Sequence, residues 1–260
     1  MKAMKKSYRQ VILASLLLCL PTIVMAEELT VAVISVFSET FLQIKPLFEQ
    51  ETGHTVRVIS DSSGVLYSKI RYSCESVDVF LSADEDRPKK LIEAGLAVPE
   101  SFTVYALGKL VLWTKSNDDL QLAPESLSKF KYIAFPTPKN SPYGSATQEA
   151  LTRLKLWEVV KPNLVIFNTI VAAYEATLQH QTQAGFIGLA QYLSEIENLG
   201  TNYLIIPSSL YPPLSQAAVM MWATKHPTGA QALLDFLHHP LAIKVIHDFG
   251  FGTVDQRSDD

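Results

Sequence analysis

Leu29-Thr-Val-Ala-Val-Ile34 is an uninterrupted apolar run of the kind that forms a buried strand. From about Ser38 the apolar residues recur at helical spacing until Gly53. Val56 to Ile59 then predicts a second strand, and a further helix is expected from Ser63. This alternation of strands and helices indicates an α/β fold with a parallel sheet whose faces are covered by helices.

Two long apolar segments interrupt the alternation and divide the chain. Val104 to Trp113 reads as one long strand, and a similar strand runs from Ala217 to Trp222. We therefore expect a first lobe from residues 27–106 and 211–260 and a second lobe from residues 107–210, each a sheet flanked by helices. Two strands that cross between lobes make a hinge and a cleft.

The first 26 residues have the pattern of a cleavable export signal. A basic start precedes an apolar run from Val11 to Leu20, which is too short to span a bilayer. Val24-Met25-Ala26 suits cleavage, so the mature chain is expected to begin at Glu27. Cys19 follows Leu18 rather than a small residue, which argues against lipid attachment there. The pattern predicts a periplasmic protein.

Composition excludes several classes of partner. After cleavage 234 residues remain, with 18 basic against 26 acidic side chains and a net charge of −8. Such a surface argues against nucleic acid and anionic membranes as partners. Cys74 is then the single cysteine, so no intramolecular disulfide can form. We expect a soluble monomer.

Two helix starts are rich in hydroxyl groups and glycine: Asp61-Ser62-Ser63-Gly64 and Ser141-Pro142-Tyr143-Gly144-Ser145. Helix N-termini present unpaired backbone N–H groups and partial positive charge, and can hold a small anion without a formal cation. The simpler interpretation is that these serines only cap helices. Anion sites in both halves of an exported α/β chain favour a solute-binding protein.

Signals for catalysis or metal binding are weak. The chain contains no Gly-x-Ser-x-Gly elbow, no His-Glu-x-x-His and no phosphate-binding Gly-Lys-Ser/Thr loop. His238, His239 and His247 with Asp248 match no strong zinc pattern. We therefore predict no enzyme activity, no metal and no cofactor. The alternative is a secreted hydrolase, which a serine beside a base in the cleft would favour.

A set of short motifs resembles the periplasmic molybdate-binding proteins of ABC transporters. The motifs are Phe48-Glu-Gln-Glu-Thr-Gly53, Ser62-Ser63-Gly64, Asp78-Val-Phe-Leu-Ser-Ala-Asp84, Leu107-Gly-Lys-Leu-Val-Leu112 and Asp248-Phe-Gly-Phe251. The resemblance extends from Leu29 to Gly252. It implies the two-lobe type II fold of periplasmic binding proteins, in which two α/β lobes joined by two crossing strands enclose the ligand. It also implies an oxyanion of the molybdate or tungstate type, which an inner-membrane ABC permease receives.

The resemblance also assigns site residues. The family's two serine donors align with Val36, beside Ser35, and with Ser63. Two backbone-amide donors align with Tyr143 and Ile170, and a tyrosine donor aligns with Gly188.

Val36 and Gly188 therefore lack two hydroxyl donors, which implies weaker molybdate binding unless the Tyr143 hydroxyl, Ser35 or Ser38 replaces them. Ser35 is one residue early, and strand alternation would turn it the other way. The missing tyrosine could also leave room for a larger ligand. The alternatives are thus a protein of the same fold for another small anion or an organic acid, or a sensor.

Overall fold

The computed structural model describes residues 26–72, 76–115, 120–194 and 202–253. The expected signal segment up to position 25 and Cys74 lie outside the described residues. Within the described part, no helix is both long enough and apolar enough to cross a membrane.

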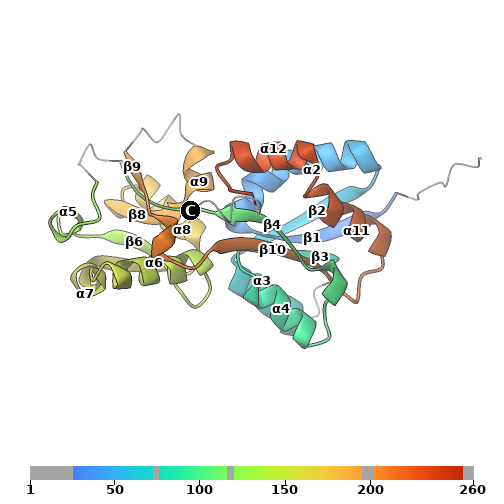
Figure 1. Cartoon of the computed structure of the whole chain (residues 1–260), viewed down its shortest axis with the longest axis horizontal. Coiled ribbons are helices and arrows are strands. Elements are labelled where there is room, and N and C mark those ends of the chain that lie inside the picture. The colour runs from blue at the N-terminus through green and yellow to red at the C-terminus, as the bar shows by residue number, and fades with distance from the viewer. Residues whose placement is uncertain (1–25, 73–75, 116–119, 195–201, 254–260) are drawn as a thin grey trace, which may run out of the picture.

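The chain forms two α/β lobes that lie side by side, each built on a five-stranded sheet (Figure 1). The first sheet has the order β2-β1-β3-β10-β4. Its strands β1, β2 and β3 are parallel, whereas β10 is antiparallel to β3 and β4. Their bounds are β1 Glu28–Ile34, β2 Thr55–Asp61, β3 Val79–Ser82, β4 Thr103–Gly108 and β10 Leu214–Met220.

The second sheet has the order β7-β6-β8-β5-β9. Here β6 is parallel to β7 and β8, and β5 is antiparallel to β8 and β9. Their bounds are β5 Leu110–Thr114, β6 Ile133–Pro136, β7 Leu164–Phe167, β8 Ala184–Gly188 and β9 Tyr203–Ile205. The predicted fold class, two lobes of sheet and helix, is confirmed.

The apolar segment from Val104 to Trp113 is two strands rather than the single long strand expected from its sequence. β4 ends at Gly108 in the first sheet and β5 begins at Leu110 in the second, with Lys109 between them. The chain returns between the end of β9 and the start of β10. Apolar content could not reveal this break, because the sequence is apolar on both sides of it, although β5 is buried throughout and β4 only in part. We propose these two crossings as the lobe boundaries.

Helices cover both faces of the first sheet, with α2 and α12 on one side and α3 and α4 on the other (Figure 1). Phe41, Ile44 and Phe48 on α2 are fully buried, and burying each such side chain contributes about 1.5–3 kcal/mol. The longer helices of this lobe are α2 Ser38–Thr52, α3 Ser63–Tyr72, α4 Asp86–Glu93, α11 Pro227–Phe236 and α12 Pro240–Asp248, and the one-turn segments are η1 Ser35–Phe37 and η2 Pro99–Ser101.

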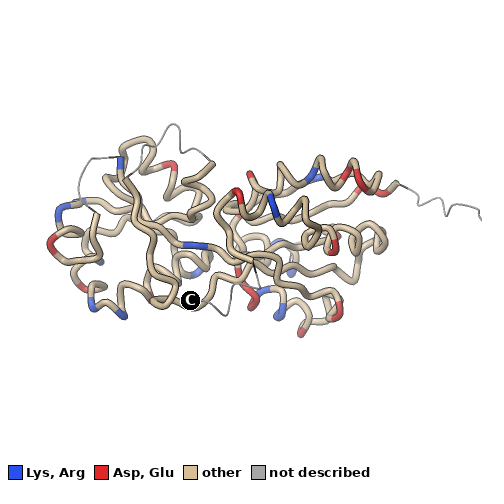
Figure 2. The backbone as a smooth tube through the Cα atoms, turned by 45° about the horizontal axis from the view of Figure 1, so that its top comes forward, with Lys and Arg blue, Asp and Glu red and all other residues tan. Residues whose placement is uncertain are grey.

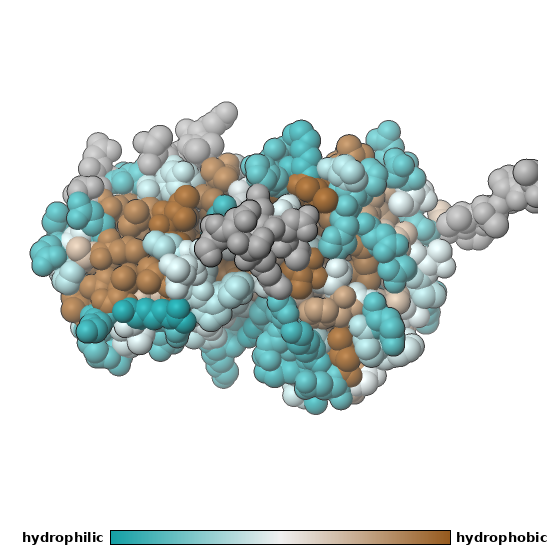
Figure 3. All heavy atoms as spheres, viewed as in Figure 1, coloured by the Kyte–Doolittle hydropathy of each residue, from teal (hydrophilic) through white to brown (hydrophobic). Residues whose placement is uncertain are grey.

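The second lobe has shorter helices around its sheet. Their bounds are α5 Pro124–Leu127, α6 Pro142–Arg153, α7 Trp157–Val160, η3 Lys161–Asn163, α8 Ile170–Leu178, α9 Leu189–Leu193 and η4 Ser208–Leu210. Acidic and basic residues are scattered over both lobes without a large area of one sign (Figure 2). On the face shown in Figure 3, apolar side chains are most visible over the second lobe, and α3 and α4 present polar ones.

Candidate functional site

A small cavity lies between the lobes, where the carboxyl ends of parallel strands from both sheets meet. This is the edge at which open α/β sheets bind ligands, because helix N-termini gather there. The space between its walls is about 210 Å³, part of which is open to solvent. It is lined by Ile34, Ser35, Val36, Ser62, Ser63, Ala83, Ser141, Pro142, Tyr143 and Ile170.

Ser35 and Val36 reach the cavity because β1 ends just before them. The strand stops at Ile34, and residues 35–37 form a single 3₁₀ turn that leads into α2. Strand alternation therefore does not apply at Ser35, and the expectation that it points the other way is wrong: both residues line the cavity. Ser38 does not line it, since its hydroxyl lies 2.5 Å from that of Ser60 and 3.3 Å from the Ile34 carbonyl oxygen.

Ser63 is positioned by a hydrogen bond to the next strand end. Its Oγ accepts the backbone N–H of Ala83 at 3.0 Å, just after β3, and the residue is 2 % exposed. This bond fixes the hydroxyl oxygen and leaves its own proton available to donate. The cap of α3 is instead Ser62, whose Oγ lies 3.4 Å from the Val65 nitrogen. The two neighbouring serines thus have different roles.

The second lobe contributes the starts of α6 and α8. Tyr143 follows Pro142 in the first turn of α6 and is 1 % exposed. Ile170 is the first residue of α8, which Thr169 caps by accepting the Ala172 N–H at 3.0 Å. Both residues line the cavity through the beginning of a helix, as expected from the sequence.

Several helix-start amides already have hydrogen-bond partners, but at each start at least one amide of the described residues has none. The N–H groups of Gly64, Val65, Gly144, Ala172 and Ala173 donate to nearby oxygens. Among the hydrogen bonds of the described residues, the backbone N–H groups of Ser63, Tyr143 and Ile170 have no such acceptor. Three helix starts from two lobes therefore offer unpaired donors to one cavity.

Gly188 does not leave space for a larger ligand. A Cβ at this position would lie 2.7 Å from Val36 Cγ2 and 3.3 Å from Tyr143 Cε1. The place where a side chain at position 188 would begin is thus already occupied by Val36 from the first lobe and by the Tyr143 ring from the second. The expectation of a widened pocket at Gly188 is wrong, because the sequence does not show which distant side chains fill the gap.

The cavity contains no formally charged side chain. Asp61, which the sequence places nearby, does not line it and forms an ion pair with Lys69 at 3.3 Å. Burial raises the pKa of the Tyr143 hydroxyl well above its usual value, with the nearby Tyr211 as a smaller cause, so this group stays neutral. The Tyr143 hydroxyl is buried and has no hydrogen-bond partner among the described residues.

The tyrosine hydroxyl is directed to the hinge. A Cβ on Gly108, the last residue of β4, would lie 2.2 Å from Tyr143 Oη and 3.0 Å from the Gln216 side-chain nitrogen on β10. The ring therefore extends from the cavity to the crossing strands.

The histidines near the carboxyl end of the chain have structural roles. His238 Nε2 lies 2.7 Å from Thr103 Oγ1, and His239 Nδ1 accepts the Leu241 N–H at the start of α12. Within the described part of the chain, no three His, Cys, Asp or Glu side chains gather as a metal site would require.

Sequence reasoning named five of the cavity-lining residues, and Gly188 lies directly behind two of them. The lining residues that it did not assign are Ile34, Ser62, Ala83, Ser141 and Pro142. All five lie within sequence segments already singled out, or at their ends, so their position next to a strand end or a helix start was the available signal.

Comparison with known proteins gives the family. Residues 29–252 match the family model described as bacterial extracellular solute-binding protein. The chain belongs to this family.

Two relatives are molybdate-binding proteins named ModA. One, from Rhodobacter capsulatus, is 36% identical over 231 residues, which are 88% of this chain and 89% of the relative. The other, from Azotobacter vinelandii, is 35% identical over 229 residues, 87% of this chain and 90% of the relative.

Two solved structures have the same fold as this chain. The Azotobacter vinelandii periplasmic molybdate-binding protein superposes with a TM-score of 0.78 at 30% identity, covering 86% of this chain and 98% of that one. The sulfate-binding protein SubI from Mycobacterium tuberculosis superposes with a TM-score of 0.74 at 13% identity, covering 88% of each chain, which shows the fold alone.

Proposed function

We propose that this protein binds a molybdate-type oxyanion in the interlobe cavity, in the periplasm, and delivers it to an ABC permease of the inner membrane. No chemistry on the ligand is involved. The observation that carries the proposal is the set of unpaired N–H donors of Ser63, Tyr143 and Ile170 around one cavity without formal charge. The molybdate-binding relatives support the choice of anion.

A neutral, donor-lined cavity suits a transported dianion. Each hydrogen bond to a charged acceptor contributes about 1.5–3 kcal/mol, and exclusion of water strengthens it. A buried cation would add attraction, but it would also slow release to the permease. Ser35, Ser63, Tyr143 and Ile170 are the proposed ligand contacts, with Val36 and Gly188 shaping the wall beside them.

The proposal is tested with the mature chain, from residue 27, by calorimetry and thermal unfolding with molybdate and tungstate. At 1,000 times its dissociation constant a ligand adds about 4 kcal/mol to the free energy of unfolding, and Tm rises by about 10 °C for a chain of this size. Because Val36 and Gly188 supply no hydroxyl, we expect weaker affinity than in members that have both donors.

Sulfate and an organic acid such as citrate serve as comparison ligands. No change in Tm with any tetrahedral oxyanion at millimolar concentration would contradict the proposal. A shift with citrate alone would assign the site to a different anion.

A further inference from the structure

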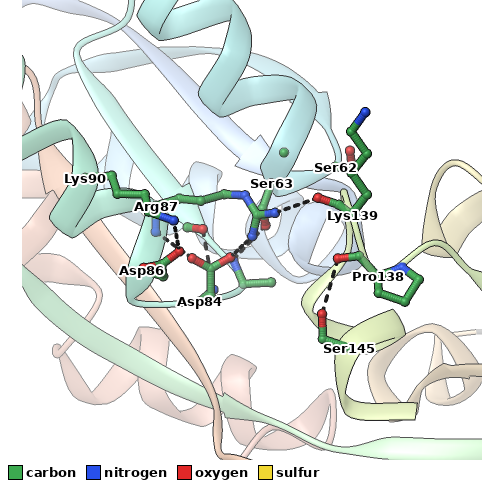
Figure 4. Close-up of polar contacts among 12 residues, drawn as sticks. Ser62, Ser63, Asp84, Asp86, Arg87, Lys90, Pro138, Lys139 and Ser145 are labelled. Carbon is green, nitrogen blue, oxygen red and sulfur yellow. Dashed lines mark hydrogen bonds and ion pairs between the residues drawn. The ribbon is translucent and has the colours of Figure 1, made fainter. Parts of the chain in front are cut away.

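Two hydrogen bonds join the lobes beside the cavity. The backbone N–H of Gly64 on α3 donates to the Asn140 carbonyl oxygen at 3.2 Å. The Arg87 guanidinium on α4 donates to the Lys139 carbonyl oxygen, also at 3.2 Å (Figure 4). Both donors belong to the first lobe, and both acceptors are consecutive residues of the loop between β6 and α6. We call these four residues the interlobe latch.

Arg87 is held in place from its own lobe. Its backbone N–H donates to Asp84 Oδ1 at 2.7 Å, and its guanidinium forms an ion pair with Asp84 Oδ2. Figure 4 shows the guanidinium between Asp84 and the Lys139 backbone. The Arg87 and Asp84 side chains are each 17% exposed. Because Asp84 neutralises and orients Arg87, the planar guanidinium can present its second edge to the other lobe with little loss of side-chain freedom.

Gly64 allows the other contact by having no side chain. A Cβ there would lie 2.9 Å from Asn140 Cα and 3.2 Å from its carbonyl oxygen. Both are backbone atoms, which cannot turn aside as the tip of a side chain can. The residue lies inside α3, where alanine is the more favourable residue. The close approach of the second lobe, and not the helix itself, therefore requires glycine.

The loop that the latch holds leads directly into the cavity. Lys139 and Asn140 precede Ser141, Pro142 and Tyr143, all of which line the cavity. Among the hydrogen bonds of the described residues, the Tyr143 N–H has no acceptor. Fixing residues 139 and 140 against the first lobe therefore fixes this donor relative to Ser63 across the cavity.

We propose that Arg87 and Gly64 are positioning residues that hold the lobes closed and set how long the anion stays bound, without touching it. This inference rests on the proposed function. The latch exists only where the lobes meet, so its loss should act on dissociation of the ligand rather than on association. The neighbouring ion pairs Lys89–Glu85 and Lys90–Asp86 each join residues four apart in the chain, at the start of α4 in the first lobe.

The test compares Arg87→Gln and Gly64→Ala with two controls on the same helices. Lys90→Gln removes the same charge from α4. Ser68→Ala makes an exposed change to alanine on α3; it removes a hydroxyl that donates to the Gly64 carbonyl oxygen at 2.9 Å but keeps the Gly64 N–H that contacts Asn140. With molybdate followed by stopped-flow fluorescence, the latch variants should release the anion about 5- to 50-fold faster at nearly unchanged association rate. Gly64→Ala should not lower the Tm of the ligand-free protein, because alanine favours the helix.

A ligand-independent measurement separates the latch from the proposed function. In small-angle scattering without ligand, Arg87→Gln and Gly64→Ala should have larger radii of gyration than the wild type, Lys90→Gln and Ser68→Ala. Release rates within twofold of the wild type for both latch variants, or radii equal to those of the controls, would overturn the inference. Failure of the wild type to bind molybdate would instead overturn the proposed function, and the scattering comparison would still decide on the latch.

Discussion

At the scale of single residues, Ser63 is distinguished from its neighbour Ser62 by what its hydroxyl oxygen accepts. Ser62 faces back to its own helix, while Ser63 accepts the Ala83 amide from the end of β3. Adjacent serines before a helix look equivalent in sequence, because either can cap it. Only the packing of β3 beside α3 gives them separate roles, and it leaves the Ser63 proton directed to no internal acceptor that the described residues provide.

Ser63→Ala is expected to weaken molybdate binding by about 1.5–3 kcal/mol, the contribution of a hydrogen bond to a charged acceptor. It should also lower the free energy of unfolding by about 1–3 kcal/mol, because the Ala83 N–H loses its acceptor. Ser101→Ala is the matched control: Ser101 is buried in the same lobe, and its Oγ accepts the Met220 N–H at 2.9 Å. Calorimetry should show an affinity loss for Ser63→Ala alone, and equal affinities in the two variants would make Ser63 purely structural.

Val36 and Tyr143 lie so close to Gly188 that a side chain at position 188 would crowd them. Gly188→Ala is expected to weaken molybdate binding about 10-fold, since the added Cβ meets Val36 of the other lobe at 2.7 Å and opposes closure. Val36→Ala removes that contact, so the double variant should regain most of the affinity, and the two changes should not add.

This coupling is tested by measuring the molybdate affinities of the wild type, the two single variants and the double variant by calorimetry. Additive losses would show that Val36 and Gly188 do not meet.

At the scale of elements, helix α2 is stabilised by packing along its length and is ended by the backbone conformation of a single residue. The helix runs unbroken for 15 residues although Pro46 lies inside it. Burial of Phe41, Ile44 and Phe48 offsets the cost of this proline. The helix ends at Gly53, whose φ is 77° and whose N–H donates to the Glu49 carbonyl oxygen at 3.0 Å. Such a left-handed residue after a helix favours glycine strongly.

Gly53→Ala is expected to lower the free energy of unfolding by about 1–2 kcal/mol through backbone strain alone. An added Cβ would meet no atom within 4 Å, so crowding makes no contribution. Gly53→Asn should cost less, since asparagine tolerates the left-handed region better. Urea unfolding of the three proteins measures this order; an alanine variant as stable as the wild type would show that the helix ends differently in solution.

At the scale of the whole molecule, the two chain crossings make the cavity possible. β4 and β5 continue almost directly from one sheet into the other, and β10 returns to the first. Because few residues connect the lobes, small backbone changes at the crossings can separate the faces that carry Ser63 and Tyr143. The anion-binding donors and the interlobe latch then act together, since both are complete only when the lobes meet.

The sequence by itself determined the α/β class, the two-lobe organisation and five of the ten residues that line the cavity. These follow from local signals: apolar runs, helix starts with serine or proline, and the motifs from Asp61 and Ser141 that end up facing each other. Tyr143 lies in a helix start that the residues themselves indicate, whereas Ile170 was assigned through the family resemblance; backbone amides at helix starts need no particular side chain, so both assignments tolerate the change of residue.

Only the tertiary structure decided what lies between these elements. It split the segment from Val104 to Trp113 between two sheets, filled the space beside Gly188 with Val36 and Tyr143, and brought Arg87 and Gly64 against residues 139 and 140. These contacts join residues that are far apart in the chain, and no local pattern records which side chain will occupy a gap. They depend on volumes and distances across the cleft, which exist only once both lobes are folded and closed.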